Sequence, residues 1–387
     1  MKIIDRYIIK EAAFITLIGF FVFTFLLIMN SLFVMSDLVV KYNVDFFRVA
    51  KLLILILPSQ VAVTVPMAFL VGILLTYSRL VQDNEYSGMQ ASGISVRSIA
   101  IPGVILSLAL MAGLIFFNNQ ILPKANLEYK KLYYEIVKTR SNILIQEHEF
   151  IRSFDNYVFY ISEKDSRENL LKNIIIFVKD KGKERETEPI KVILSRKGRL
   201  ISDEETLRIA LKLDSGIMQA ASYVNPLKMN LISFDTNFID LDVRGVFRRH
   251  QNESELKGTR EMTIGELLNE IRKGTESTHD KNWIYIEFYK KFSLPFAVVA
   301  FALIGIPLGL MTKKGGRVIG MAYSLVLIVL YYFLISIGQN MGYRGEMNHF
   351  AAAWLPNIVT CAIAAVLFAA LFFPFLKRRL YKNRRIK

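Results

Sequence analysis

Residues able to do chemistry are concentrated in one polar segment, Arg79–Arg97, which lies between the apolar runs Leu52–Ser78 and Ser98–Phe117. Two carboxylates, Asp83 and Glu85, come near the start of this segment, where the positive end of a helix dipole would favour negative charge. A short helix fixed to two membrane spans would transmit a push from a soluble partner into the membrane. The alternative is an ordinary solvated loop between the two spans.

The segment also contains its own stop signal. Residues from Leu80 to Ala91 are compatible with a helix, and Gly93 suits the left-handed conformation that ends one. We therefore expect a short helix lying across the membrane face.

Catalytic motifs are absent from the sequence. It has no phosphate-binding Gly-x-x-x-x-Gly-Lys-Ser/Thr loop, no Gly-x-Ser-x-Gly elbow and no His-Glu-x-x-His helix. Its four histidines are scattered without metal-ligand spacing. We expect no charged residue at hydrocarbon depth in any span, which argues against ion coupling. We also expect no cofactor in this chain, so a machine of this kind must take its energy from a partner.

The elements that position the polar segment are predicted membrane helices. Hydrophobic residues make up 53% of the chain, and one cysteine, Cys361, excludes an intrachain disulfide. Six runs are long enough to cross a bilayer, which needs about 20 apolar residues. The six runs are Ala12–Ser36, Leu52–Ser78, Ser98–Phe117, Phe292–Thr312, Val318–Tyr343 and Phe350–Leu376.

Lysine and arginine in the short loops predict the orientation. One side of the membrane would carry 15 of them and the other side four. Because basic loops stay in the cytoplasm, both termini are predicted to be cytoplasmic in a multi-pass inner-membrane protein. The 15 lie in the N-terminal lead, 79–97, 312–317 and the tail 377–387. The block 119–291, whose charges nearly balance, would then face outward, into the periplasm of a cell with two membranes.

That outer block is predicted to be mainly β. Seven runs alternate between apolar and polar residues, which indicates short strands and favours a sandwich or jelly roll. Turn formers separate them, among them Lys197-Gly198 and Asp214-Ser215-Gly216. Thr263–Arg272 then reads as an amphipathic helix with a capping box from Thr263 and Glu266. The seven runs are Asn142–Phe150, Asn156–Ser162, Ile174–Val178, Ile190–Ser195, Thr206–Leu213, Ile217–Ala221 and Met229–Leu241.

Several short motifs occur in one order along these elements. They are Asp5-Arg6-Tyr7-Ile8, Pro58 with Pro66, Arg79-Leu80…Asn84-Glu85…Ala91-Ser92-Gly93-Ile94-Ser95, Pro295…Ile306-Pro307-Leu308-Gly309, Tyr331-Tyr332 and Trp354-Leu355-Pro356-Asn357. In this order and topology the sequence resembles the lipopolysaccharide export permeases of the LptF/LptG (YjgP/YjgQ) family. The resemblance covers essentially the full chain.

The resemblance implies a transport subunit and not an enzyme. Two such permeases would pair with a cytoplasmic ABC ATPase dimer, which binds ATP and magnesium. They would extract lipopolysaccharide, or a related glycolipid, from the inner membrane and pass it to a periplasmic jelly-roll bridge. The residues carried over for ATPase coupling are Asp83, Asn84, Glu85, Ser92 and Gly93, with Glu85 as the acid that engages the ATPase.

One departure concerns the lipid site. Family members carry basic residues near the outer end of the first span, whereas here the first base is Lys41. Lys41, Arg48 and Arg344 are candidates for binding lipid phosphate. The alternative is that these side chains only reach toward the membrane interface.

The predicted fold class is thus a membrane α-helical protein, with three plus three transmembrane helices and an inserted all-β, jelly-roll-like periplasmic domain. The expected domains are 1–122 with a coupling helix at 79–97, 123–282 for the β domain, and 283–387 with the basic tail. A second hypothesis is a membrane scaffold or mechanotransmission protein, whose outer domain binds an envelope partner without moving lipid.

Overall fold

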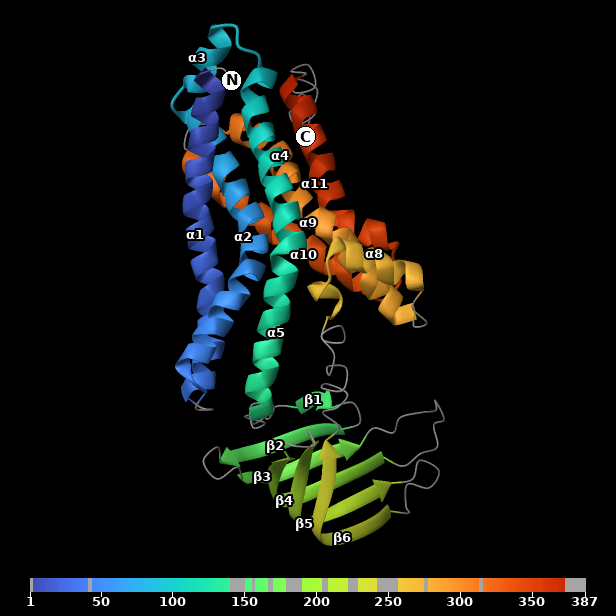
Figure 1. Cartoon of the computed structure of the whole chain (residues 1–387). Helices are drawn as coiled ribbons and strands as arrows, with labels where there is room; N and C mark the ends of the chain where they lie inside the picture. Colours follow the sequence, from blue (N-terminus) through green and yellow to red (C-terminus); the bar gives the residue numbers. More distant parts are fainter. Residues whose placement is uncertain are drawn as a thin grey trace, which may run out of the picture. The chain divides into compact units, whose positions relative to one another are not determined.

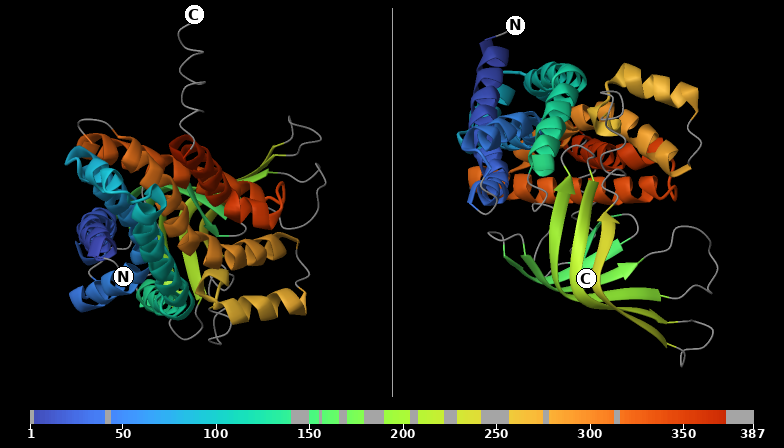
Figure 2. Two further views of the ribbon diagram at one scale, coloured as in Figure 1. Left: turned by 90° about the horizontal axis from the view of Figure 1, so that it is seen from above. Right: turned by 60° about the horizontal axis from the view of Figure 1, so that its bottom comes forward.

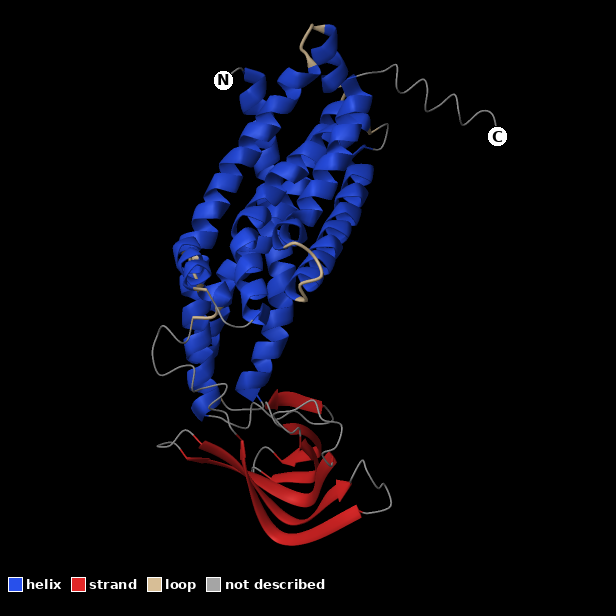
Figure 3. Ribbon diagram, turned by 90° about the vertical axis from the view of Figure 1, so that its right-hand side faces the viewer, coloured by secondary structure: helices blue, strands red, loops and turns tan. Residues whose placement is uncertain are grey.

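The computed structural model describes residues 3–40, 44–139, 150–154, 157–165, 170–178, 190–203, 208–221, 229–241, 257–274, 278–312 and 316–372. The chain divides into two compact units. The first comprises 1–31, 55–126 and 258–387, and the second comprises 32–54 and 127–257. Helices and strands are segregated within the chain, as the colours of Figure 3 show.

Six helices are long and apolar enough to cross a membrane, as predicted from hydropathy. The third is continued by a further helix, with only Ile121 between the two. The six are α1 (Ile3–Val40), α2 (Phe46–Gln82), α4 (Val96–Gln120) with α5 (Leu122–Thr139), α9 (Thr278–Met311), α10 (Gly316–Tyr343) and α11 (His349–Phe372) (Figure 1).

Helix α9 forms the centre of the first unit and α1 lies at its margin. Of the apolar stretch of α9, 72% is buried against the rest of the chain, compared with 11% for α1. The core around α9 includes Phe301, Ile306 and, from α2, Phe69 and Tyr77. The large side chains that α1 exposes between Phe14 and Val34 are apolar, so they match a hydrocarbon environment.

Helix α1 is held against α2 by small residues. A Cβ added to Gly72 would clash with the Thr16 hydroxyl and lie 3.0 Å from the Ala12 carbonyl oxygen. Ala12 and Ala68 are fully buried, and Thr24 donates a hydrogen bond to Thr64 at 3.1 Å. Close backbone approach through small residues is a usual way for membrane helices to pack without a hydrophobic driving force.

In the second unit, the described strands form one six-stranded antiparallel sheet, which confirms the inserted all-β domain. The strands pair in sequence order, so their topology is a meander, and Figure 2 shows the sheet strongly curved. The expected run Asn142–Phe150 lies outside the described residues except for Phe150. The strands are β1 (Phe150–Phe154), β2 (Tyr157–Asp165), β3 (Leu170–Val178), β4 (Ile190–Asp203), β5 (Arg208–Ala221) and β6 (Met229–Leu241).

Two turns expected inside the sheet are wrong. Lys197-Gly198 lies within β4, and the expected break at 214–216 lies within β5, which joins two predicted strands into one. The turn-forming residues bend the strands without ending them. Asn173 and Ser215 have positive φ angles of 51° and 53° on strands that both pair with β4. The Ser195 hydroxyl donates hydrogen bonds to the carbonyl oxygens of Lys197, at 2.8 Å, and Asp214, at 3.0 Å.

The bend gives the sheet an apolar interior of its own. Nine buried side chains gather in one cluster, and they come from β2, β3, β4, β5 and β6. A single sheet therefore obtains the enclosed core that was expected from a sandwich. The nine are Phe159, Ile161, Leu171, Ile174, Ile176, Ile193, Leu211, Leu213 and Ile239.

The predicted amphipathic helix is confirmed as α8 (Ile264–Lys273), which follows a short 3-10 helix, η3 (Thr259–Glu261). Thr263 and Glu266 form the expected capping box, and Asn119 on α4 accepts a further hydrogen bond from the Ile264 amide at 2.8 Å. Leu267 is fully buried. Thr263 and Glu266 thus cap the start of α8, and the bond to Asn119 attaches this helix to α4.

The first half of α9, before the predicted span Phe292–Thr312, carries buried charges. Glu287 and Lys291 are only 5% and 7% exposed. Glu287 pairs with Lys290 at 2.8 Å and accepts a hydrogen bond from the Tyr343 hydroxyl at 3.0 Å. Lys291 donates to the carbonyl oxygen of Asn118 at 3.0 Å. Each buried charge therefore has a partner, as burial requires.

Candidate functional site

The polar segment between α2 and α4 forms a short helix, α3 (Glu85–Ala91). The single helix expected from Leu80 to Ala91 is wrong, because α2 continues to Gln82 and α3 begins anew at Glu85. Asn84 causes the break, since it adopts a left-handed conformation with φ of 61°. Asparagine tolerates this region better than most residues.

The predicted termination of α3 by Gly93 is confirmed. Gly93 has φ of 81°, and its amide donates to the Gln90 carbonyl oxygen while the Ile94 amide donates to that of Met89, both at 3.0 Å. This pair of bonds is a Schellman motif, which favours glycine at its left-handed position. Ser92 closes the last turn by donating its hydroxyl to the Gly88 carbonyl oxygen at 3.0 Å.

Helix α3 has one packed face and one open face. Tyr86, Met89 and Ile94 pack against the core of the first unit, and burial raises the pKa of the Tyr86 hydroxyl above its usual value. The open face carries small or polar exposed residues, which we call the α3 outer face. They are Ser87, Gly88, Gln90, Ala91 and Ser92.

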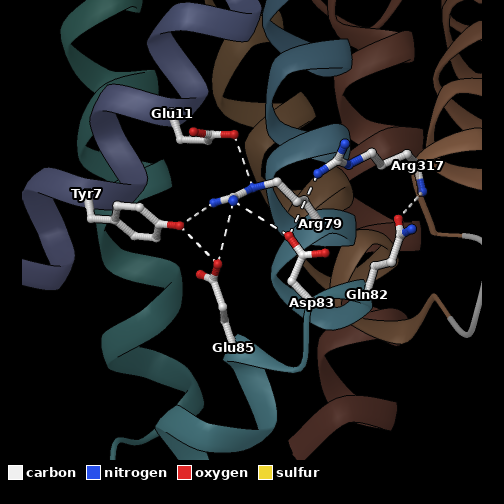
Figure 4. A network of polar contacts seen from close by, with 7 residues as sticks. All are labelled: Tyr7, Glu11, Arg79, Gln82, Asp83, Glu85 and Arg317. Carbon is white, nitrogen blue, oxygen red and sulfur yellow. Dashed lines mark hydrogen bonds and ion pairs between the residues drawn. The ribbon is translucent and has the colours of Figure 1, made fainter.

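Arg79, on the last turn of α2, connects three helices through its guanidinium group (Figure 4). Its Nε lies 3.0 Å from Glu11 of α1, and its Nη1 lies 3.6 Å from Asp83 and 3.5 Å from Glu85 of α3. Arg79 is only 16% exposed, so these pairs lie partly out of water. A planar guanidinium suits such a junction, because its five donors point in fixed directions.

Tyr7 of α1 completes this junction. Its hydroxyl accepts a hydrogen bond from Arg79 Nη2 at 2.5 Å and donates one to Glu85 Oε1 at 3.0 Å. The guanidinium also lies over the tyrosine ring, 5.4 Å from its centre. Arg79, Tyr7, Glu11, Asp83 and Glu85 are called the Arg79 junction below.

The junction extends to the start of α10. Arg317 lies 3.7 Å from Asp83, and its amide donates to the Gln82 side chain at 3.3 Å. Asp83 therefore lies between two arginines from different helices (Figure 4). The segment after α2 is in this way attached to α1 on one side and to α10 on the other.

The five residues predicted for coupling take distinct positions around α3. Asp83 and Glu85 bind Arg79, Asn84 forms the entry turn, and Ser92 and Gly93 form the exit. Sequence reasoning missed Tyr7, Glu11 and Arg317 as partners of this site. Tyr7 and Glu11 are four residues apart and so share one face of α1, but nothing in the sequence indicates that this face meets Arg79.

Comparison with known proteins identifies the family. Residues 6–370 match the family described as lipopolysaccharide export system permease LptF/LptG. The chain belongs to this family. The permease is 19% identical to the lipopolysaccharide export system permease protein LptF of Escherichia coli K12 over 369 residues, which cover 94% of each chain. It is 25% identical to the uncharacterized protein RP871 of Rickettsia prowazekii over 134 residues, which are 35% of the permease and 36% of that protein.

Family membership and the six helices make the chain a multi-pass inner-membrane permease of the lipopolysaccharide export type, a transport subunit rather than an enzyme. The recognition of the family from its sequence motifs is therefore confirmed.

Two of the three candidates for lipid phosphate lie among the described residues, one in each unit. Lys41 lies outside the described residues. Arg48 is exposed on α2, in the second unit, whereas Arg344 belongs to the first unit. Arg344 is 73% exposed and lies 3.9 Å from Glu346, in the turn between α10 and α11. Their role in phosphate binding stays a prediction.

Proposed function

We propose that this permease extracts lipopolysaccharide from the inner membrane for delivery to a periplasmic bridge protein, using ATP hydrolysed by a separate ABC ATPase dimer. ATP and magnesium would bind to that partner, and a second permease of the same family would complete the membrane part. The observation that supports the proposal is the family match over residues 6–370, combined with a short helix anchored between two spans.

The α3 outer face is the proposed docking surface for the ATPase. Its residues are exposed and, apart from Gln90, small, so a partner can approach the helix backbone closely. At Gly88 an added Cβ would meet nothing within 4 Å, which means that this position is open. The packed face of α3 rests on the core, so a load on the outer face would be carried into α2 and α4.

The orientation in this proposal follows the loop charges. Both termini and α3 would lie in the cytoplasm and the sheet in the periplasm. Accessibility of single cysteines to a membrane-impermeant reagent tests this arrangement. A cysteine at Gln90 that reacts from the periplasmic side of intact cells would overturn it.

The lipid would meet the exposed apolar faces of α1 and α10. Phe21, Phe25 and Phe33 of α1 are 63%, 64% and 64% exposed, and Val329 and Phe333 of α10 are 68% and 62% exposed. Each methylene moved into water costs about 0.8 kcal/mol, so a lipid with several acyl chains needs apolar surface throughout its path. The apolar interior of the curved sheet is the proposed shelter beyond the membrane.

The first experiment places bulk on the docking surface. Gly88→Trp should abolish co-purification of the ATPase and lipopolysaccharide-coupled ATP hydrolysis, and the charge reversal Glu85→Lys should weaken both. Gly113→Trp is the matched control, because Gly113 on α4 also has open space around it. An unchanged Gly88→Trp complex would contradict the proposed docking surface.

A second experiment separates transport from the scaffold hypothesis. A photo-crosslinking amino acid at buried sheet positions such as Ile176 or Leu213 should yield lipopolysaccharide adducts during ATP turnover. Adducts to protein alone would favour a scaffold.

A further inference from the structure

Tyr7 belongs to the Asp5-Arg6-Tyr7-Ile8 motif, to which the proposed function gives no role. The structure places its hydroxyl between Arg79 and Glu85, with the distances given above. Its ring is 39% exposed, so the side chain is not needed to fill the core. The next residue, Ile8, is 1% exposed and provides that packing.

Glu85 is engaged within the chain. Both the Tyr7 hydroxyl and Arg79 Nη1 contact the same oxygen, Oε1, at 3.0 and 3.5 Å. Hydrogen bonds that involve ionised groups are roughly twice as strong as neutral ones. The carboxylate of α3 is therefore bound to α1 through Tyr7, and to α2 through Arg79, when no partner is present.

We propose that Tyr7 and Arg79 are positioning residues that hold Glu85 as an internal tether between α3 and α1, so that docking on the α3 outer face moves α1. This inference rests on the proposed function, because it concerns how force from the ATPase reaches the lipid-facing helices. Glu85 is then held by contacts inside the permease, in addition to its proposed part in ATPase binding.

The packing of α1 explains why a tether is needed there. Only 11% of its apolar stretch is buried, and its close contacts with α2 involve small residues such as Ala12 and Gly72. A helix held so lightly follows the motion of α3 only if a specific bond connects them. Tyr7 and Glu11 lie on the α1 face that meets Arg79, and they provide this connection (Figure 4).

A double-mutant cycle tests the tether with minimal changes in shape. Tyr7→Phe removes one hydroxyl and Glu85→Gln removes one charge. Each complex is reconstituted with its ATPase and second permease in proteoliposomes, and lipopolysaccharide released per ATP hydrolysed is measured. Each single variant should lower this ratio about tenfold, the lower limit expected for loss of one hydrogen bond to a charged group. Tyr7→Phe should leave the affinity for the ATPase unchanged.

The double variant should be no worse than either single variant, because both changes break the same tether. Tyr86→Phe is the matched control. It also removes a hydroxyl, but that hydroxyl bonds Gln90 of the same helix at 2.9 Å. If the two losses multiply, or if Tyr7→Phe equals the wild type while Glu85→Gln is impaired, the tether is refuted. A wild-type complex that releases no lipid would instead refute the proposed function.

A distance measurement keeps the test independent of activity. Spin labels at Lys10 of α1 and Gln90 of α3, with Cys361 replaced by serine, report the separation of the two helices. Because Gln90 lies on the α3 outer face, the distances are measured in the full-length permease without its ATPase. The distribution should be narrow in the otherwise wild-type protein and should broaden in the Tyr7→Phe variant. A distribution that Tyr7→Phe leaves unchanged would overturn the inference.

Discussion

Replacement of Arg79 by alanine gives the most direct test of the junction. The change removes the only described cation within 4 Å of both Glu11 and Glu85. It leaves three carboxylates, of which Glu11 is 29%, Glu85 is 30% and Asp83 is 38% exposed. Asp83 keeps Arg317 as a partner at 3.7 Å.

The expected cost is about 3 kcal/mol of unfolding free energy. Each partly exposed ion pair contributes roughly 0.5–1 kcal/mol, because water still screens the carboxylates. The hydrogen bond to Tyr7 adds about 1 kcal/mol. Together the three pairs and this bond amount to about 2.5–4 kcal/mol, and mutual repulsion of the three remaining carboxylates acts in the same direction.

Unfolding of the purified permease in mixed micelles, titrated with SDS, measures this cost. Arg79→Lys keeps the charge but cannot direct separate nitrogens at Glu11, Asp83 and Tyr7, so it should lose about half as much. Raising the salt to about 1 M, where the screening length is roughly 3 Å, should reduce the difference in unfolding free energy between the wild type and the alanine variant. An alanine variant within about 0.5 kcal/mol of wild type, or a lysine variant equal to wild type, would refute the reasoning.

Two further substitutions test the packing of the first unit. Gly72→Val should separate α1 from α2 and lower the unfolding free energy by more than about 2 kcal/mol in the same titration, as overpacking does. Gly113→Ala, whose added methyl group meets no neighbour, should be neutral. Equal effects of the two variants would contradict the close contact. Glu287→Leu should cost about 3 kcal/mol, because it leaves Lys290 and the Tyr343 hydroxyl without their buried acceptor; a neutral result would show that this cluster is dispensable for stability.

The sequence predicted the membrane helices well because hydrocarbon imposes one rule on every residue of a span. Six long apolar runs therefore indicated six helices, and the structure extends each of them at its N-terminal end. The start of α8 was equally predictable, since the capping box joins Thr263 to Glu266 within one turn. Signals confined to neighbouring residues, or averaged over about 20 of them, survive folding.

Local signals whose outcome depends on contacts with distant parts of the chain predicted the structure poorly. Asp214-Ser215-Gly216 has the composition of a turn, yet pairing with both neighbouring strands keeps β5 continuous through it. Unlike Gly93, Asn84 gives no clear signal in the sequence for the end of a helix. Its left-handed conformation nevertheless ends α2. In both cases, contacts made elsewhere select a conformation that the local residues merely permit.

The Arg79 junction was beyond prediction for a geometric reason. Tyr7 and Arg79 are 72 positions apart, and Gln82 and Arg317 are 235 apart. Their meeting depends on how α1 and α10 pack beside α2. Sequence motifs could mark Glu85 as important without revealing which groups it binds.

The distribution of polar contacts indicates which helices can move. On α9, Glu287 and Lys291 are buried and bonded to α10 and α4, so displacing α9 would expose or separate charges at a cost of several kcal/mol. On α1, Tyr7 and Glu11 make side-chain contacts with Arg79 and Glu85 of the junction. A load on α3 would thus meet least resistance along α1, whose exposed surface from Phe14 to Val34 is mainly apolar and would exchange one lipid contact for another as the helix moves.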